Sequence, residues 1–234
     1  MQLLVYFFQS QLEDHLFYRA NNAYDQTVTV QDYTITVGAG GSQRTSNGHG
    51  NNGSASNAFG LTSDGGGGGG AHNNRGRDGG SGGGSGHSHT HGNATGNGSG
   101  NRGGNHQSHN CGGGGGAHQR GSDQHSNHGA GHGGRGEQCD ITGVPKWYAG
   151  GGGASGHNHT SHADGGLGGG GGCAGGAGED GTGGGGGATE GPSGQVQYGG
   201  KGGDGWILEL PPIPGVVNQS YATGVEIWID GQEV

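Results

Sequence analysis

Glycine dominates the middle of this chain and decides what the chain can fold into. Of 69 glycines in 234 residues, all but three lie within residues 38–205. About two in five residues of this window carry no side chain beyond hydrogen, and almost none is a large aliphatic residue. Such residues cannot fill a close-packed hydrophobic interior. The window is therefore either unstructured or ordered by backbone that packs against backbone.

The overall composition argues against some kinds of binding partner. Hydrophobic residues make up only 25% of the chain, which is low for a globular protein. The net charge is −9, and the nine Lys and Arg residues form no run, so nucleic acid and anionic membrane are poor partners. The three cysteines match no disulfide framework or zinc motif. We expect no membrane insertion, because no stretch is long enough to span a bilayer.

The two ends of the chain have ordinary side chains and predict short strands. Alternating β-branched residues over 26–37 predict a tight hairpin. Residues 206–210 predict a strand, and so do residues 225–229, which the turn dipeptide Asp230-Gly231 follows.

We therefore divide the chain into three regions. Residues 1–37 form an N-terminal β module for attachment or assembly, residues 38–205 a glycine-rich domain, and residues 206–234 a C-terminal β-strand segment.

The glycine window could be a flexible linker or a packed bundle. Gly/Ser-rich chains usually behave as random coils, and ordering each residue costs about 1–2 kcal/mol of conformational entropy. Against this, the glycines cluster in blocks instead of alternating with serine, at residues 65–70, 112–116, 150–153, 168–172 and 183–187. Extended helices with three residues per turn can pack closely where glycine lies at each contact. We predict a mostly irregular and β fold, in which short β modules frame a bundle of polyglycine II-type helices with essentially no α-helix.

Several stretches occur in an order that identifies a known pattern. They are YTITVGAGG at 33–41, NNGSAS at 51–56 before Phe59, YAGGGG at 148–153, GGLGGG at 165–170 and GGDGWILEL at 202–210. This order resembles the glycine-rich domain of bacteriophage tail-fibre and receptor-binding proteins. The similarity covers roughly residues 26–210, while the histidine content and the lack of a preceding coiled-coil or β-helical shaft depart from that pattern.

The resemblance implies a virion protein, a tail-fibre tip or adhesin, made in the host cytoplasm. Its implied partners are further copies of itself in a homo-oligomer such as a trimer, other virion proteins, and a host surface glycan or outer-membrane protein. In such domains, variable loops at one end of the bundle touch the host. The candidate contact residues are those that interrupt the glycine blocks, namely Phe59, His89, His109, His128, Trp147, Tyr148 and His159.

Histidines are the second unusual feature, and three explanations for them stay open. Fourteen of the fifteen lie between His49 and His162. They could bind a divalent metal, for which His87, His89 and His91 have His-x-His spacing and imidazole chemistry suits Zn, Ni, Cu and Fe. In a trimeric fibre, the resemblance would imply an iron site on the axis. They could form a polar face for sugars, or they could be neutral filler.

An enzyme is not expected, because the window contains neither a phosphate-binding GxxxxGK[ST] loop nor a nucleophile elbow on a strand-to-helix turn. Two other functions remain as alternatives. One is a purely structural filament or capsid-decoration subunit with a rigid glycine-rich layer, and the other is a His-rich metal-binding protein.

Overall fold

Within the residues that it describes, the computed structural model contains no α-helix and only short strands, so the fold is mostly irregular and β, as the sequence predicted. No helix long and apolar enough to cross a membrane occurs in the part that it describes. That part comprises residues 7–8, 34–44, 48–58, 60–71, 74–87, 89–95, 100–107, 110–124, 129–139, 144–156, 163–173, 175–188, 200–204, 206–207, 228–229 and 232–233.

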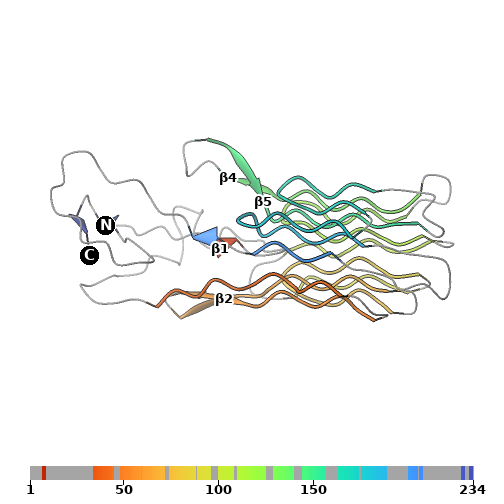
Figure 1. The fold of residues 1–234 in the computed structure, drawn as a ribbon, viewed down its shortest axis with the longest axis horizontal. Helices are drawn as coiled ribbons and strands as arrows, with labels where there is room; N and C mark the ends of the chain where they lie inside the picture. Colours follow the sequence, from red (N-terminus) through yellow and green to blue (C-terminus); the bar gives the residue numbers. More distant parts are fainter. Residues whose placement is uncertain are drawn as a thin grey trace.

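The glycine-rich window forms a bundle of extended segments that run back and forth along one axis (Figure 1). The amide of Ser54 donates to the Ala39 carbonyl at 2.9 Å, and the amide of Gly53 donates to the Gly66 carbonyl at 3.0 Å. These bonds join three passes of the chain in sequence order. We call the end at which residues 34 and 204 lie the stem end, and the opposite end the loop end.

Hydrogen bonds between the segments repeat every three residues. The amides of Gly150 and Gly153 both donate to the segment 168–171, each at 2.9 Å, whereas the amide of Gly151 donates to Gly134 at 2.8 Å. Amides three positions apart thus reach the same neighbour, and adjacent amides reach different neighbours. A period of three is that of an extended helix with three residues per turn, which has no internal hydrogen bonds.

The glycine run at 112–116 contacts neighbours in several directions. Three consecutive amides donate to three different segments: Gly113 to Ser122 at 3.2 Å, Gly114 to Gly152 at 2.9 Å and Gly115 to Gly82 at 2.9 Å. All five residues of the run are buried. The run therefore lies in the interior of the bundle, where its backbone replaces the side chains of an ordinary core.

Close contact between backbones explains why glycine is needed. A β-carbon added to Gly68 would overlap the carbonyl oxygen of Gly50, and one added to Gly152 would overlap the carbonyl oxygen of Gly186. Even alanine would force neighbouring segments apart at these positions. The hydrogen bonds of the bundle therefore depend on bare Cα atoms at each crossing.

The strands pair as four short antiparallel ladders, β1 with β6, β2 with β3, β4 with β5 and β7 with β8. Their bounds are β1 Phe7–Phe8, β2 Ser56–Ala58, β3 Leu61–Ser63, β4 Glu137–Cys139, β5 Lys146–Tyr148, β6 Trp206–Ile207, β7 Trp228–Ile229 and β8 Gln232–Glu233.

Strand prediction from the sequence was right in part. Of the predicted strand 206–210, residues 206–207 are present as β6, and of the predicted strand 225–229, residues 228–229 are present as β7, which pairs with β8. The other residues of both predicted strands lie outside the described residues. The hairpin predicted over 26–37 is not formed within the described residues 34–37, where only Thr36 makes a bridge, to Asn57. Its first arm lies outside the described residues.

The first and last passes meet and close the bundle. The amide of Gly202 donates to the Gly41 carbonyl at 2.8 Å, and the amide of Gly40 donates to the Asp204 carboxylate at 2.9 Å. Just beyond them, β1 pairs with β6, with Phe8 opposite Trp206. The chain therefore begins and ends its course through the bundle at the same end.

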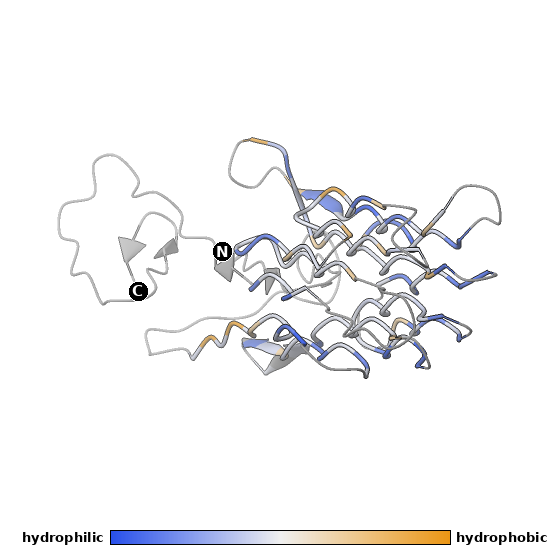
Figure 2. Cartoon of the chain, turned by 45° about the vertical axis from the view of Figure 1, so that its right-hand side comes forward, coloured by the Kyte–Doolittle hydropathy of each residue, from blue (hydrophilic) through white to orange (hydrophobic). Residues whose placement is uncertain are grey.

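Apolar side chains contribute only a small core. Cys111, Ala130, Ala154 and Ala163 form one buried cluster, and Tyr148 is the largest fully buried side chain, at 1% exposed. Figure 2 shows most of the bundle in pale colours of intermediate hydropathy, with hydrophilic colours at the turns of the loop end. Buried side chains therefore make up a small part of the interior of the bundle, and packed backbone makes up most of it.

A candidate binding surface at the loop end

Turns of the chain gather at the loop end. Two of them lie between residues 173 and 175 and between residues 188 and 200. The others lie between residues 44 and 48, 71 and 74, 107 and 110, 124 and 129, and 156 and 163, and at the turn 87–89. Outside residues 174 and 189–199, the sequence that joins these positions consists largely of His, Asn, Ser and Thr. Except for positions 87 and 89, the joining residues lie outside the described residues. Backbone hydrogen bonds between neighbouring passes hold the flanking residues in place, such as the bond from the Cys111 amide to the Ser155 carbonyl at 3.4 Å.

Histidine rings at the loop end are tied to neighbouring passes. The Nδ1–H of His49 donates to the Arg75 carbonyl at 2.8 Å, and the Nδ1–H of His106 donates to the His89 carbonyl at 2.7 Å. His91 donates to the Asn105 amide oxygen at 2.7 Å. Each of these rings keeps part of its surface accessible. The loop end therefore presents polar rings in defined positions.

A charged network borders this surface. Asp123 accepts a hydrogen bond from the Asn105 amide at 2.8 Å and pairs with Arg102 at 3.4 Å and Arg120 at 2.9 Å. Partial burial raises the pKa of Asp123, but the hydrogen bonds from Asn105 and Arg102 outweigh burial and hold the pKa below its usual value. The carboxylate thus stays ionised and holds Arg102 and Arg120, of which Arg102 lies 3.5 Å from Nδ1 of His91.

The predicted metal ligands are not assembled in this chain. His87, His89 and His91 are all described, yet no group of three or more His, Cys, Asp or Glu side chains within the described residues is arranged to hold a metal ion. His89 instead accepts a bond through its carbonyl, and His91 binds Asn105. The first two histidines lie in the turn 87–89 and the third in the next pass. A site shared between several copies stays a prediction.

Two aromatic candidates lie at the stem end instead of the loop end. Trp147 in β5 is half-buried, with the Arg135 guanidinium 5.4 Å from its ring centre. Tyr148 was predicted to contact a receptor, and this prediction is wrong for the structure described, because its side chain is only 1% exposed. Burial also raises the pKa of its hydroxyl. Tyr148 is a core residue.

The predicted contact residues therefore do not share one surface. His89 lies in the turn 87–89 at the loop end, whereas Trp147 lies in β5 at the stem end (Figure 1). The other candidates, Phe59, His109, His128 and His159, lie outside the described residues.

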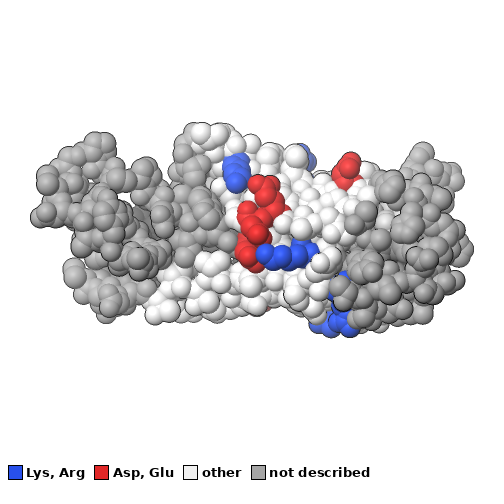
Figure 3. Space-filling view, in the orientation of Figure 1, with Lys and Arg blue, Asp and Glu red and all other residues white. Residues whose placement is uncertain are grey.

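One feature that the sequence interpretation missed is a repeated ion-pair spacing. Arg75 pairs with Asp78, Arg120 with Asp123 and Lys201 with Asp204, each three positions apart. On the face shown in Figure 3, basic side chains lie beside acidic ones. A spacing of three places both residues on one side of a three-per-turn helix. In the sequence, a basic residue followed by Asp three positions later could thus have predicted these ion pairs.

The fold and its turns define a class of protein, a backbone-packed glycine-rich bundle that presents polar connections at one end. The family model described as "Glycine-rich domain" matches residues 17–208. The chain belongs to this family of glycine-rich domains. Comparison with curated proteins and with solved structures gave no match.

Proposed function

We propose that this protein is a bacteriophage virion protein, a tail-fibre tip or receptor-binding adhesin that recognises the host cell surface. The observation that carries the proposal is the separation of the two ends of the bundle. The first and last passes meet at the stem end, where the Gly40 amide donates to Asp204 and β1 pairs with β6. Anything attached through the termini would leave the loop end free.

A bundle of polyglycine II-type helices suits this role. The period of three in the hydrogen bonds and the need for glycine at the crossings support such helices. Because each pass is held by several neighbours, the positions where loops begin and end are fixed. Recognition residues are commonly placed on loops carried by a rigid scaffold.

The chemistry of the loop end favours a polar ligand such as a glycan. His, Asn and Ser side chains can donate and accept hydrogen bonds, and His49, His91 and His106 already donate to neighbouring passes. Several copies on one virion would strengthen weak contacts through avidity.

Competition for adsorption tests the proposal. Purified protein added to the phage's host cells should reduce adsorption of that phage. The double variant His89→Ala/His91→Ala at the loop end should compete less well, while His118→Ala should compete like the native chain. His118 is a suitable control because it is exposed at the stem end, where it pairs with Glu137 at 3.0 Å.

The opposite result would point to a different role. If native protein binds no host cells and leaves adsorption unchanged, the adhesin proposal is wrong. A chain that instead assembles into filaments or decorates capsids would be a structural subunit.

A further inference from the structure

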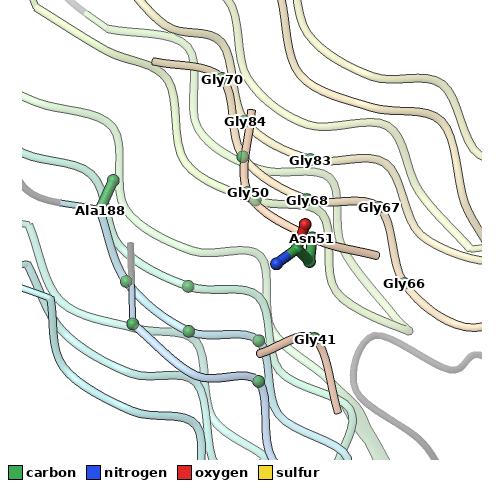
Figure 4. Close-up of a pocket in the computed structure, with 18 of the residues that line it drawn as sticks. Gly41, Gly50, Asn51, Gly66, Gly67, Gly68, Gly70, Gly83, Gly84 and Ala188 are labelled. Atoms are coloured by element: carbon green, nitrogen blue, oxygen red, sulfur yellow. The ribbon is translucent and has the colours of Figure 1, made fainter. Parts of the chain in front are cut away.

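Backbone hydrogen bonds join eight passes into a ring around a hollow of about 90 Å³. Figure 4 shows this hollow with lining residues such as Gly41, Asn51 and Ala188. Each pass donates or accepts a backbone hydrogen bond with the next, and the last bonds to the first. In ring order the passes are 38–44, 48–55, 64–71, 82–86, 110–116, 149–156, 183–188 and 200–204. The hollow is thus built by segments from both ends of the sequence.

Backbone donors without partners border this hollow. Gly66, Gly84 and Gly152 line it and are buried, and their amides donate to no acceptor in the described structure. Buried N–H groups are almost always paired with protein or ordered water. Because these glycines line the hollow, an acceptor bound in it would satisfy amides that the described residues leave unpaired.

Arg44 adds a positive charge to the same lining. Its Nε is fully shielded from solvent and has no hydrogen-bond acceptor. Arg75, Arg102 and Arg120 each pair with an aspartate, but no Asp or Glu is found among the described residues that line the hollow. A shielded N–H group without an acceptor is unfavourable, so a hydrogen-bond acceptor is expected beside Nε of Arg44.

We infer that the hollow binds a small oxyanion, a carboxylate or a phosphate, through Arg44 and the free backbone amides. Arginine presents planar donors that match these groups, and backbone amides in a concave lining bind anions. The acidic net charge of −9 makes non-specific attraction of anions unfavourable. Arg44 lies at the loop-end limit of its pass, so the anion could be free or part of a larger surface molecule. The site does not depend on the proposed adhesin role.

Calorimetric titration of the full chain with inorganic phosphate, at an ionic strength held constant with sodium chloride, tests the site. We expect saturable binding that Arg44→Gln weakens by about tenfold or more, the loss typical of one charge-assisted hydrogen bond. Arg44→Lys should keep part of the affinity, because the charge remains while the planar donors are lost. Arg77→Gln is the matched control, since Arg77 is exposed and lies off the lining.

Titration with two further ligands identifies the source of the anion. If the site reads an anionic sugar, glucose 1-phosphate or glucuronate should bind more tightly than phosphate or acetate, and glucose should not bind. Equal affinities for sugar-linked and free anions would identify a site for free ions.

Two results would overturn the inference. One is an absence of saturable binding of phosphate and acetate to the native chain, which would indicate a hollow filled with water alone. The other is equal binding by native chain, Arg44→Gln and Arg77→Gln when circular dichroism shows the same fold. Because the first result needs no variant, misfolding of Arg44→Gln cannot rescue the inference.

Discussion

Asp204 accepts a hydrogen bond from the amide of Gly40 at 2.9 Å, across 164 positions of sequence. Lys201 lies 3.0 Å from the same carboxyl group and 3.1 Å from that of Asp180. The amide of Asp204 in turn donates to Asp180 at 3.0 Å, and this bond, with the one from Lys201, lowers the pKa of Asp180. One acidic residue therefore links the first pass, the last pass and a turn of the stem end.

Removal of this link should weaken the whole bundle. Asp204→Ala should lower the free energy of unfolding by about 1–3 kcal/mol, because it leaves the Gly40 amide without its acceptor. Denaturant unfolding measures the change. Asp64→Ala is the control, since Asp64 is exposed and has no hydrogen bond or ion pair in the described structure. Equal stability of the two variants would contradict a closing role for Asp204.

Substitution by alanine should change the stability of the protein at one of two adjacent glycines and hardly at the other. In Gly68→Ala the new methyl group would overlap the Gly50 carbonyl oxygen, so overpacking should destabilise the protein by about 1–3 kcal/mol. In Gly69→Ala the methyl group meets nothing within 4 Å, so the change should stay within about 0.5 kcal/mol. Thermal unfolding compares the pair. A flexible linker would show the same result for both variants.

Hydrogen exchange should separate paired from unpaired amides within glycine runs. The amides of Gly113, Gly114 and Gly115 donate to three different passes, and all three residues are buried, so they should exchange slowly. Gly69 is an exposed residue and its amide donates to no described acceptor, so this amide should exchange fast. Exchange measured by NMR on labelled glycine resolves these amides. Uniformly fast exchange would mean that the window is an unfolded tether.

Acid should release the bonds that carboxylates make to other passes. The backbone hydrogen bond from Asn93, at 2.7 Å, is the largest cause that lowers the pKa of Asp78, and Arg75 lowers it further. A lowered folded-state pKa contributes stability above the unfolded value of about 4, and this stability is lost as pH falls through the folded-state pKa.

Asp78→Asn should therefore be less stable than the native chain at neutral pH and should lose less stability between about pH 4 and pH 2. Unfolding by denaturant at several pH values measures both effects. Asp64→Asn, at an exposed position without such bonds, should follow the native profile. If Asp78→Asn also follows that profile, the Asn93 bond does not contribute to acid sensitivity.

Much of the scaffold could be predicted from glycine alone. Runs such as 112–116 indicated backbone packing, because glycine is the residue that allows it, and the run is buried with amides that reach three passes. The sequence could not give the neighbours of each pass. Which carbonyl faces Gly114 depends on the route of the whole chain, and glycine carries no side chain that would specify a partner.

The surface was harder to predict than the scaffold. Tyr148 and Trp147 are adjacent aromatic residues beside a glycine run, yet one is buried and the other half-buried in β5. Their sequence does not distinguish a core role from a contact role. Arg44 gave no signal either, because its unpaired Nε follows from a hollow that only the assembled ring creates.

The alternating direction of the passes also restricts how such a chain can change length. A chain that enters and leaves the bundle at the stem end needs an even number of passes. Loss or gain of a single pass would therefore place residues 200–204 so that the chain leaves at the loop end. The link from Asp204 to Gly40 and the pairing of β1 with β6 would then be impossible. Among related chains, whole passes should therefore be inserted or deleted two at a time, whereas the turns between passes can lengthen freely.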